Sequence, residues 1–540
     1  MTKSLQQPKM ALRRLLQLRG VNSLCHCTRP HGLIDMIFRS HSKMQIRAMS
    51  FKTEDIGQFL QSMFTTPDLG SGATENKCKR FCSYYRTLQD TQNKMAFLGQ
   101  LSQQYSIDQD AVLQGAHTLA SSQDRGEAQV IKSMERLRSA MTPRYQTLFQ
   151  QIGRIEGGVK FLVDMRADLL GCIGGSTLTS ELDTVNFYAL NRLLRELLTL
   201  WFAVGFLELQ RVTWTSPCDI VQKISDYEAV HPIRSWTDLK QRVGAYRRCY
   251  TFTHHSMPRE PVVVLHTALT SEISSNIHSI IHNPRFRANT PESESTSTQQ
   301  NRNPSAFDEE EDPSQITTAV FYSITSTQKG LQGVELGNYL IKSVVRQLQS
   351  EFPHLSQFSS LSPIPGFRDW LVRQINSQLQ RSDIGEEDSG KPLLSQSEIQ
   401  SLKNVRQSQN ASALETFKRF VQSNQWLARQ DTVEAVKGAL LRLCARYLYL
   451  EKRRGLAFNP VANFHLTNGA VLWRINFLAD TSIRGLNQSC GLMVNYRYYL
   501  SDTKSNSQNY LLHHTIPASP TVLELLRSEL SPSPAQNGDR

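Results

Sequence analysis

The chain has 540 residues, of which 39% are hydrophobic and 20% charged, values typical of a globular protein with two or three domains. Its net charge of +12 would suit a nucleic-acid partner, but residues 1–48 supply eight of those charges. The rest of the chain has no stripe of basic and aromatic residues, so no nucleic-acid partner is expected. No apolar run reaches the roughly 18 residues of a membrane span, and the longest, Leu197–Leu207, is predicted to be a buried helix.

Residues 1–48 are predicted to be a mitochondrial transit peptide. They contain nine Lys or Arg and a single acid, Asp35, among many Ser and Leu, as such leaders do. The alternative is a disordered basic tail. Met49, where the composition becomes globular, could serve as a second start and give a cytosolic form. The C-terminal SPAQNGDR is not a Ser-Lys-Leu address, so the mitochondrial matrix is expected rather than the peroxisome.

Residues 49–205 are predicted to form a helical bundle. Thr142-Pro143 is a typical helix start, and apolar residues then recur at helical spacing from Tyr145 to Leu169. A second apolar stripe runs along Val185–Leu200. No strand-like run interrupts the region, and no residue in it suggests catalysis. Its expected role is as a scaffold or an oligomer contact.

From about residue 206 the pattern becomes mixed α and β, and a catalytic domain is predicted over 206–530. Pro261–Leu269 and Ile316–Thr325 are β-branched runs suited to buried strands. Between them, about residues 285–315 are polar, rich in Pro and Ser, and end in an acidic cluster. That composition predicts a disordered insertion in the domain.

A glycine-bearing loop, QKGLQGVELG, joins the second of these strands to a predicted helix, NYLIKSVVRQLQSEF. Glycines let the backbone approach a ligand, and the free N–H groups of a helix N-terminus favour phosphate. An ordinary strand-to-helix turn would need the same small residues, so both interpretations are open. Glu335 would repel phosphate unless it points away, or it could orient another part of a ligand.

Ser362 and His465 do not indicate a function when each is taken alone. Ser362 lies in SSLSPIPGF without the GxSxG surroundings of a hydrolase nucleophile, and a turn residue is the simplest interpretation. His465 lies between an Asn-Pro corner and the Asn468-Gly469 turn, where a hydrogen-bonded core histidine is the simplest interpretation.

The nine cysteines predict free thiols in a reduced compartment. They form no Cys-x-x-Cys pair, and beyond the first 48 residues there is no Cys/His cluster at zinc spacing, so no metal site is expected. Cross-linking of subunits through Cys218 under oxidation, like regulation by acetylation, is left open.

Four long stretches together resemble one family. SSLSPIPGF, FYSIT with the loop KGLQGVELG, MPREPVVVLHTAL and NPVANFHLTNGAVLWRIN resemble the malonyl-CoA decarboxylases of animals. The resemblance is dense over about residues 206–500 and looser in the helical region. It implies an α+β protein, in which a helical N-terminal domain supports a homotetramer and precedes an acetyltransferase-like catalytic domain of the GNAT superfamily.

The resemblance also implies a reaction. It is the conversion of malonyl-CoA to acetyl-CoA and carbon dioxide in fatty-acid metabolism, with no metal or organic cofactor. An acyl-CoA acyltransferase or thioester hydrolase on the same fold is the first alternative, because a fold does not define a reaction. A CoA-sensing scaffold without activity is the second, and the complete Ser/His/Glu set disfavours it.

The resemblance assigns roles to individual residues. The catalytic serine falls on Ser362 and the proton-donating histidine on His465, while Ser323 and Tyr498 match residues around the substrate. The CoA-substrate loop falls on Gln332, Gly333, Val334, Glu335, Leu336, Gly337 and Asn338, the last of which stands where a threonine is expected.

The chemistry agrees with this assignment. Loss of carbon dioxide from a malonyl thioester leaves an enolate whose charge lies on the thioester oxygen, so the substrate provides its own electron sink. The protein must exclude water, direct donors to that oxygen, and deliver a proton to carbon. We hypothesise that Ser362 hydrogen-bonds the malonyl group, with a covalent role left open, and that a protonated His465, titrating near neutral pH, quenches the enolate.

Overall fold

The structure is a computed structural model that describes residues 55–65, 71–122, 126–175, 180–281, 311–334, 336–384, 392–405 and 411–530. The predicted transit peptide, Met49, Glu335 and most of the predicted insertion lie outside these ranges. Within them, no helix is long and apolar enough to span a membrane.

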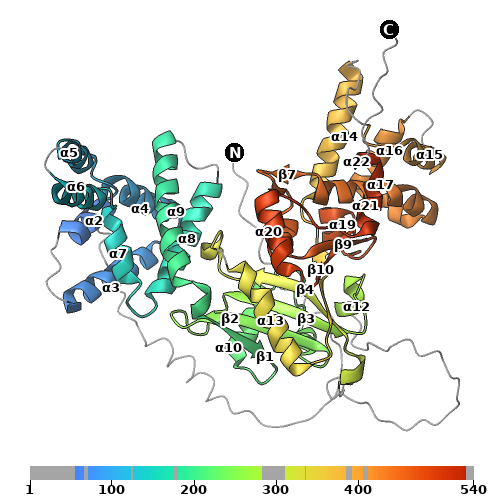
Figure 1. The fold of residues 1–540 in the computed structure, drawn as a ribbon, viewed down its shortest axis with the longest axis horizontal. Helices are drawn as coiled ribbons and strands as arrows, with labels where there is room; N and C mark the ends of the chain where they lie inside the picture. The colour runs from blue at the N-terminus through green and yellow to red at the C-terminus, as the bar shows by residue number, and fades with distance from the viewer. Residues whose placement is uncertain are drawn as a thin grey trace, which may run out of the picture. The chain divides into compact units, whose positions relative to one another are not determined.

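The described residues up to Trp201 form helices only (Figure 1), which confirms the predicted helical N-terminal region. The buried residues of the last two helices, such as Leu162 and Leu194, recur at the helical spacing expected of a core-facing side. The helices are α2 (Ile56–Thr65), α3 (Ser71–Thr87), α4 (Thr91–Gln104), α5 (Gln109–Ala120), α6 (Glu127–Ala140), α7 (Arg144–Ile152), α8 (Gly158–Gly174) and α9 (Glu181–Trp201).

Three details of this region were predicted wrongly. The periodic run from Tyr145 to Leu169 is not one helix, because the chain turns between α7 and α8, where Gly157 adopts φ +68° and a Cβ on Gly158 would lie 1.7 Å from a backbone oxygen. The N-cap is Pro143 rather than Thr142. Leu197–Leu207 is also not a helix: α9 ends at Trp201, and a 3-10 turn, η2 (Val204–Phe206), leads into a strand.

The remainder is built on a mixed eight-stranded sheet with the order β1-β2-β3-β4-β5-β10-β6, to which β9 is added by pairing with β10. Both predicted strands are present, as β3 and β4, which confirms the mixed α and β prediction. The strands are β1 (Leu207–Val212), β2 (Arg247–His254), β3 (Val263–Thr270), β4 (Thr318–Ser326), β5 (Gln357–Ser360), β6 (Ser362–Pro363), β9 (Val471–Asn476) and β10 (Met493–Tyr498), with a separate pair β7 (Lys452–Arg453) and β8 (Leu456–Ala457).

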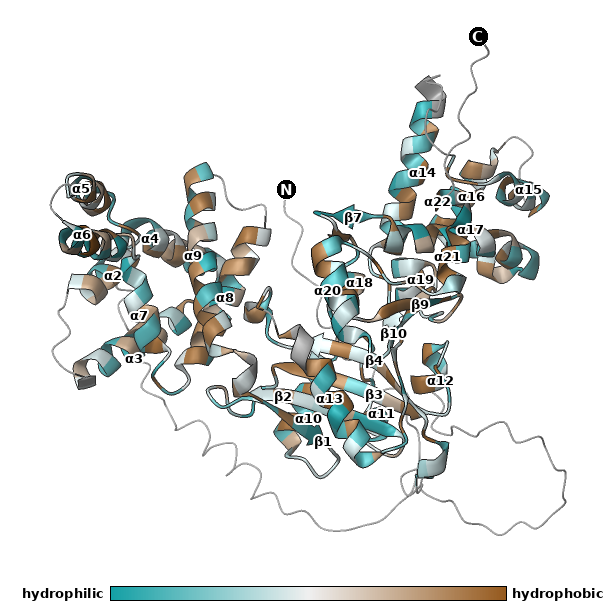
Figure 2. Cartoon of the chain, viewed as in Figure 1, coloured by the Kyte–Doolittle hydropathy of each residue, from teal (hydrophilic) through white to brown (hydrophobic). Residues whose placement is uncertain are grey.

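Helices surround this sheet, and α13 is hydrophobic on the side that buries Leu340, Val344 and Leu348 and hydrophilic on the other (Figure 2). These helices are α10 (Cys218–Tyr227), α11 (Trp236–Arg242), α12 (Ile277–Ile281), α13 (Gly337–Glu351), α14 (Phe367–Ile384), α15 (Gln396–Val405), α16 (Ala413–Ser423), α17 (Gln430–Tyr449), α18 (Pro460–Thr467), α19 (Ile483–Ser489), α20 (Thr503–His513), α21 (Pro520–Leu525) and α22 (Arg527–Leu530), with 3-10 turns η3 (Pro313–Gln315), η4 (Lys329–Leu331) and η5 (Gln425–Ala428).

The end of the predicted insertion is structured, unlike the expectation for residues 285–315. Glu311 accepts hydrogen bonds at 2.7 Å from both terminal nitrogens of Arg248, which is buried, and also one from the backbone N–H of Tyr246. The acidic cluster therefore ends on a buried cation, a contact that its composition alone does not reveal.

Two parallel strands separate at the centre of the sheet. β4 and β5 pair from Thr318↔Gln357 to Phe321↔Ser360, after which β4 continues to Ser326 while β5 has ended. Beyond that point β10 pairs with the short strand β6 instead. β4 and β5 are therefore no longer paired beyond Phe321.

Candidate active site

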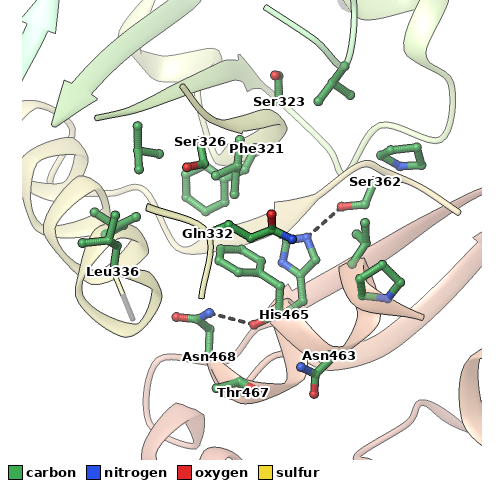
Figure 3. A pocket seen from close by; sticks show the side chains of 18 of the residues that line it. Phe321, Ser323, Ser326, Gln332, Leu336, Ser362, Asn463, His465, Thr467 and Asn468 are labelled. Atoms are coloured by element: carbon green, nitrogen blue, oxygen red, sulfur yellow. Dashed lines mark hydrogen bonds between the residues drawn. The ribbon is translucent and has the colours of Figure 1, made fainter. Parts of the chain in front are cut away.

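A cavity of about 1210 Å³ lies where β4 and β5 separate. Its volume is larger than the roughly 300–1,000 Å³ of pockets for drug-sized ligands, so a long ligand can be accommodated. β4, the loop after it, β6 and α18 all contribute to its wall (Figure 3). The residues from the sequence prediction that line it are Ser323, Gln332, Gly333, Val334, Leu336, Ser362 and His465.

The structure brings Ser362 and His465 into direct contact, although 103 residues separate them in the chain. Ser362 Oγ lies 2.9 Å from His465 Nε2, and Figure 3 shows the two side chains pointing toward each other at the cavity wall. Both are buried, with 5% and 3% of their surface exposed. A hydroxyl and an imidazole held in this way can exchange a proton with each other and with a bound ligand.

The local sequence explains how the pair is positioned. Ser362 pairs with Val494 across β6 and β10, so the sheet register fixes its place. His465 lies on α18, where Asn459 caps the helix by accepting from the N–H groups of its first turn, and Pro460 stands at the first position. Asn459 Nδ2 also donates to the carbonyl of Pro365 at 2.9 Å, which ties the helix of His465 to the turn after Ser362.

Two tyrosines of β10 hold the imidazole. They are two residues apart and so lie on one face of the strand. Tyr496 stacks on the ring at 4.5 Å between centroids with an interplanar angle of 17°, and the hydroxyl of Tyr498 lies 2.7 Å from His465 Nδ1. Tyr498 is not among the residues that line the cavity, so its place is behind the histidine, although the sequence prediction put it beside the substrate.

The protonation of His465 differs from the expectation. Burial lowers its pKa to about 3, and no carboxylate among the described residues lies against the ring to oppose that effect. The imidazole is therefore neutral at neutral pH in the ligand-free protein. In the arrangement where Ser362 donates to Ser360 Oγ at 2.8 Å, the Nε2–H of His465 donates to Ser362, and Tyr498 donates to Nδ1.

This low pKa predicts a loss of stability in mild acid. Below pH 6.5 the unfolded chain binds a proton at His465 that the folded protein binds only near pH 3, so the free energy of unfolding falls as pH decreases between these values. At pH 5 the contribution is about 2 kcal/mol. Urea unfolding at pH 7 and pH 5 should show a loss that is smaller by about that amount in His465→Asn than in wild type. Equal losses of unfolding free energy in both proteins would contradict a low pKa for His465.

Replacing Tyr498 with Phe should lower kcat about tenfold, because a buried ring nitrogen loses its partner and the tautomer that Tyr498 fixes. KM should change little, since Tyr498 does not line the cavity. Steady-state kinetics check this result. Tyr496→Phe is the matched control, because its buried hydroxyl has no hydrogen-bond partner among the described residues and its ring would still stack on His465. Equal effects of the two changes would argue against an orienting role for the Tyr498 hydroxyl.

Ser323 is held by a buried carboxylate that the sequence prediction missed. Its hydroxyl donates to Glu228, with distances of 2.9 Å and 2.7 Å to the two carboxylate oxygens, and the backbone N–H groups of Val230 and His231 donate to the same group. Burial raises the pKa of Glu228, but His266, these donors and Ser323 outweigh it, so the pKa lies below its usual value. The proton of Ser323 is thus engaged, and its oxygen can accept from a ligand. Glu228 lies outside every quoted motif, so the sequence carries no signal for it.

The glycine loop joins β4 to α13, as predicted, and lies beside the cavity. Gln332 and Gly333 are exposed in the cavity, whereas Val334 and Leu336 are buried beside it. Gly337 and Asn338 open the first turn of α13. Glu335 lies outside the described residues. The described part of the loop therefore leads from the cavity to the N-terminus of a 15-residue helix, a suitable place for an anionic group.

A buried Ser–His pair beside a large cavity is an arrangement typical of enzymes, because it provides an acid–base group and a place for a substrate. Family models for the C-terminal and N-terminal domains of malonyl-CoA decarboxylase match residues 205–536 and 105–202. The chain belongs to the malonyl-CoA decarboxylase family.

The similar proteins agree with this family. The mitochondrial malonyl-CoA decarboxylase of Anser anser anser is 44% identical over 465 residues, 86% of each chain, and that of Rattus norvegicus is 46% identical over 84% of this chain and 85% of the relative. The crystal structures of malonyl-CoA decarboxylase from Rhodopseudomonas palustris and Agrobacterium vitis match with TM-scores of 0.70 and 0.67, each at 30% identity over 87% of this chain and 99% of the other. The fold class of a helical domain followed by a mixed α/β domain is thereby confirmed.

Proposed function

We propose that this protein is a carboxy-lyase that converts malonyl-CoA to acetyl-CoA and carbon dioxide, with Ser362 and His465 as its catalytic residues. The observation that carries the proposal is the 2.9 Å contact between the two side chains in the wall of the cavity, in a chain of the malonyl-CoA decarboxylase family. Control of the malonyl-CoA level in fatty-acid metabolism would be the consequence of this activity.

The bound substrate changes the charge of His465. The described residues of the ligand-free site place no anion against the imidazole, and the malonyl carboxylate supplies one. Its arrival in a buried site raises the pKa of His465, so the imidazole takes up a proton with the substrate. The hypothesis of a protonated histidine therefore applies to the complex rather than to the free protein.

The reaction then needs only groups of this chain and the substrate. The bond between the carboxyl carbon and C2 breaks, neutral carbon dioxide leaves, and the electron pair moves to the thioester oxygen as an enolate. Ser362 donates to that oxygen, and His465 gives its proton to C2, which completes acetyl-CoA and returns the neutral imidazole. One proton is taken up for each carbon dioxide released. Because the thioester accepts the charge, no organic cofactor or metal is part of the proposal.

The remaining site residues bind the substrate. The loop Gln332–Asn338 receives the CoA portion, with its phosphates near the N-terminus of α13, and Ser323 accepts a hydrogen bond from an N–H of the ligand. Glu335 and Tyr498 complete the proposed set, the latter through His465. The same proposal includes a homotetramer and a mitochondrial location directed by residues 1–48, supported by the family resemblance and by the mitochondrial relatives.

A thioester hydrolase or acyltransferase is the second candidate, and the Ser362–His465 contact itself favours it. A serine hydroxyl at 2.9 Å from an imidazole is the arrangement of a nucleophile and its base. The group that orients the imidazole is a tyrosine hydroxyl rather than a carboxylate, so an imidazolium formed at the base would gain less stabilisation than in a hydrolase triad.

Product identity tests the proposal. The protein is mixed with malonyl-CoA that carries label in the free carboxyl, and labelled gas is followed while acetyl-CoA and free CoA are separated by chromatography. The proposal expects labelled carbon dioxide with an equal amount of acetyl-CoA. Free CoA with labelled malonate would instead establish a hydrolase, and a labelled acyl product on another acceptor would establish a transferase.

A further inference from the structure

A buried arginine of the helical domain contacts the glycine loop. Arg166, in α8, has 1% of its surface exposed. Its Nη2 donates to the carbonyl of Gln332 at 2.8 Å, and its Nη1 donates to the carbonyl of Gly330. Its Nε donates to Asn191 Oδ1 at 2.9 Å, so the guanidinium is fixed between α8 and α9. One side chain of the helical domain thus holds two carbonyls of the loop that lines the cavity.

The loop also packs directly on α8. A Cβ on Gly330 would lie 1.8 Å from the backbone oxygen of Val163, so only glycine fits at this contact. Leu331 and Val334 belong to the same buried cluster as Val163 and Leu198. The underside of the loop is therefore formed by the helical domain, which keeps the carbonyls within reach of Arg166.

Leu331–Val334 has the features of a type II turn. Gln332 has φ −56° and ψ 127°, Gly333 has φ +77°, and the N–H of Val334 donates to the carbonyl of Leu331 at 3.0 Å. A type II turn differs from a type I turn chiefly in the orientation of its central peptide, which here joins Gln332 to Gly333. Arg166 holds the carbonyl of that peptide. Because the N–H of a trans peptide points opposite to its carbonyl, the Gly333 N–H faces away from α8, on the side where Gly333 lines the cavity.

The charge of Arg166 strengthens this arrangement. Burial and the nearby Arg195 lower the pKa of Arg166 to about 10, so it is still positively charged at neutral pH. Among the described residues its hydrogen-bond partners are all neutral. A cation bonded to a peptide carbonyl polarises that peptide and makes its N–H a better donor. Within the described part of the chain, the Gly333 N–H has no acceptor, so it is available to a ligand.

We infer that Arg166 is a positioning residue of the substrate site, which holds the Gln332–Gly333 peptide so that the Gly333 N–H donates to an oxygen of the CoA portion of the substrate. The inference rests on the proposed function, since the ligand of the loop is taken to be a CoA thioester. It gives the helical domain a part in substrate binding, in addition to its expected role as scaffold or oligomer contact.

The test compares Arg166→Met and Arg166→Lys in the full chain with a matched control. Lys94→Met removes a 2.8 Å ion pair to Asp168 on the same helix α8 and leaves the loop untouched. KM and kcat for malonyl-CoA, the Kd of CoA by calorimetry and the unfolding temperature are measured for each. Arg166→Met should raise KM and Kd about tenfold or more while kcat falls by less than about threefold, because a charged hydrogen bond that orients a binding group is lost. Arg166→Lys should lie between, since one ammonium cannot hold both carbonyls in the geometry of a guanidinium.

Lys94→Met should leave KM and Kd within about twofold of wild type. The inference is overturned if folded Arg166→Met does the same, or if Lys94→Met raises KM as much as Arg166→Met. Should Arg166→Met fail to fold, Arg166→Lys and Gly333→Ala decide. Gly333→Ala makes φ +77° costly and so favours the opposite orientation of the Gln332–Gly333 peptide, which should raise KM in the same way. A variant with both Arg166→Lys and Gly333→Ala should show less than the product of the two single effects. Unchanged KM in both single variants would overturn the inference.

The two proposals fail in different ways. Failure of the proposed function appears as absence of carbon dioxide release from malonyl-CoA by the wild-type protein. The Kd of CoA does not depend on turnover, so it tests the role of Arg166 in either case.

Discussion

Replacing His465 with Asn should lower kcat for malonyl-CoA by on the order of 10²–10⁴, while the Kd of CoA stays within about threefold of wild type. Asn has no group that can be protonated near neutral pH, so the enolate left by carbon dioxide has to take its proton from water that the buried site excludes. The glycine loop and the N-terminus of α13, where we propose that CoA binds, are separate in the chain from α18, which carries His465. CoA should therefore still bind. Steady-state kinetics and calorimetry on the same preparations check both parts.

The matched control for this change is His254→Asn. His254 is equally buried, with 2% of its surface exposed, but it lies on β2 and contacts the carbonyl of Trp201 rather than the cavity. This control should keep kcat within about threefold of wild type even if it loses stability. Near-normal turnover by His465→Asn, or an equal loss in the control, would remove His465 from the mechanism.

Replacing Ser362 with Ala should lower kcat on the order of 10²-fold, because a hydroxyl that donates to the thioester oxygen, as we propose for Ser362, stabilises most when charge develops there. Ser359→Ala is the matched control, since Ser359 is also buried, donates to backbone carbonyls and is not among the described residues that line the cavity. Its kcat should change by less than about threefold. Kinetics on the two variants, purified side by side, measure the difference.

The same residue can be tested for a covalent role by rapid-quench mass spectrometry of the wild-type protein. If Ser362 acts only through a hydrogen bond, no malonyl or acetyl adduct should appear on the peptide that contains it at any time during turnover. An adduct that forms and decays at the rate of turnover would instead make Ser362 a nucleophile. The hydrogen-bonding role would then have to be abandoned, although the decarboxylase activity could remain.

Much of the fold could be predicted because local patterns agree with it. The helical spacing of Leu190, Leu194 and Leu198 gave the buried side of α9, and the β-branched runs gave β3 and β4. The break between α7 and α8 was missed, because the apolar period continues through it, and only Gly157 and Gly158 mark the turn. Leu197–Leu207 was assigned to a helix on hydrophobicity alone, which does not distinguish the end of α9 from the start of β1.

The site was predicted less completely than the fold. Ser362 and His465 were named from long motifs, but nothing local shows that the pairing of β6 with β10 and the Asn459 cap of α18 bring them together. The low pKa of His465 follows from its burial in the tertiary structure, so the sequence favoured a histidine that titrates near neutral pH. Glu228 contacts Ser323, and Arg166 contacts the carbonyls of Gly330 and Gln332, in each case from a distant part of the sequence. Such distant contacts leave no pattern in the chain.

We propose that Ser362 and His465 act together on one substrate, and a single-turnover experiment checks this joint action. Protein in excess is mixed with malonyl-CoA labelled in the free carboxyl, and the release of labelled gas is timed for wild type, Ser362→Ala, His465→Asn and the double variant. We expect each single variant to release the label at least about 10²-fold more slowly, since Ser362 stabilises the enolate as it forms, and an enolate that His465 does not protonate takes carbon dioxide back before the gas escapes. The double variant should be about as slow as the slower single one, because residues that act as a unit are not additive. Release at the wild-type rate by either single variant, or a double variant slowed by the product of both effects, would contradict it.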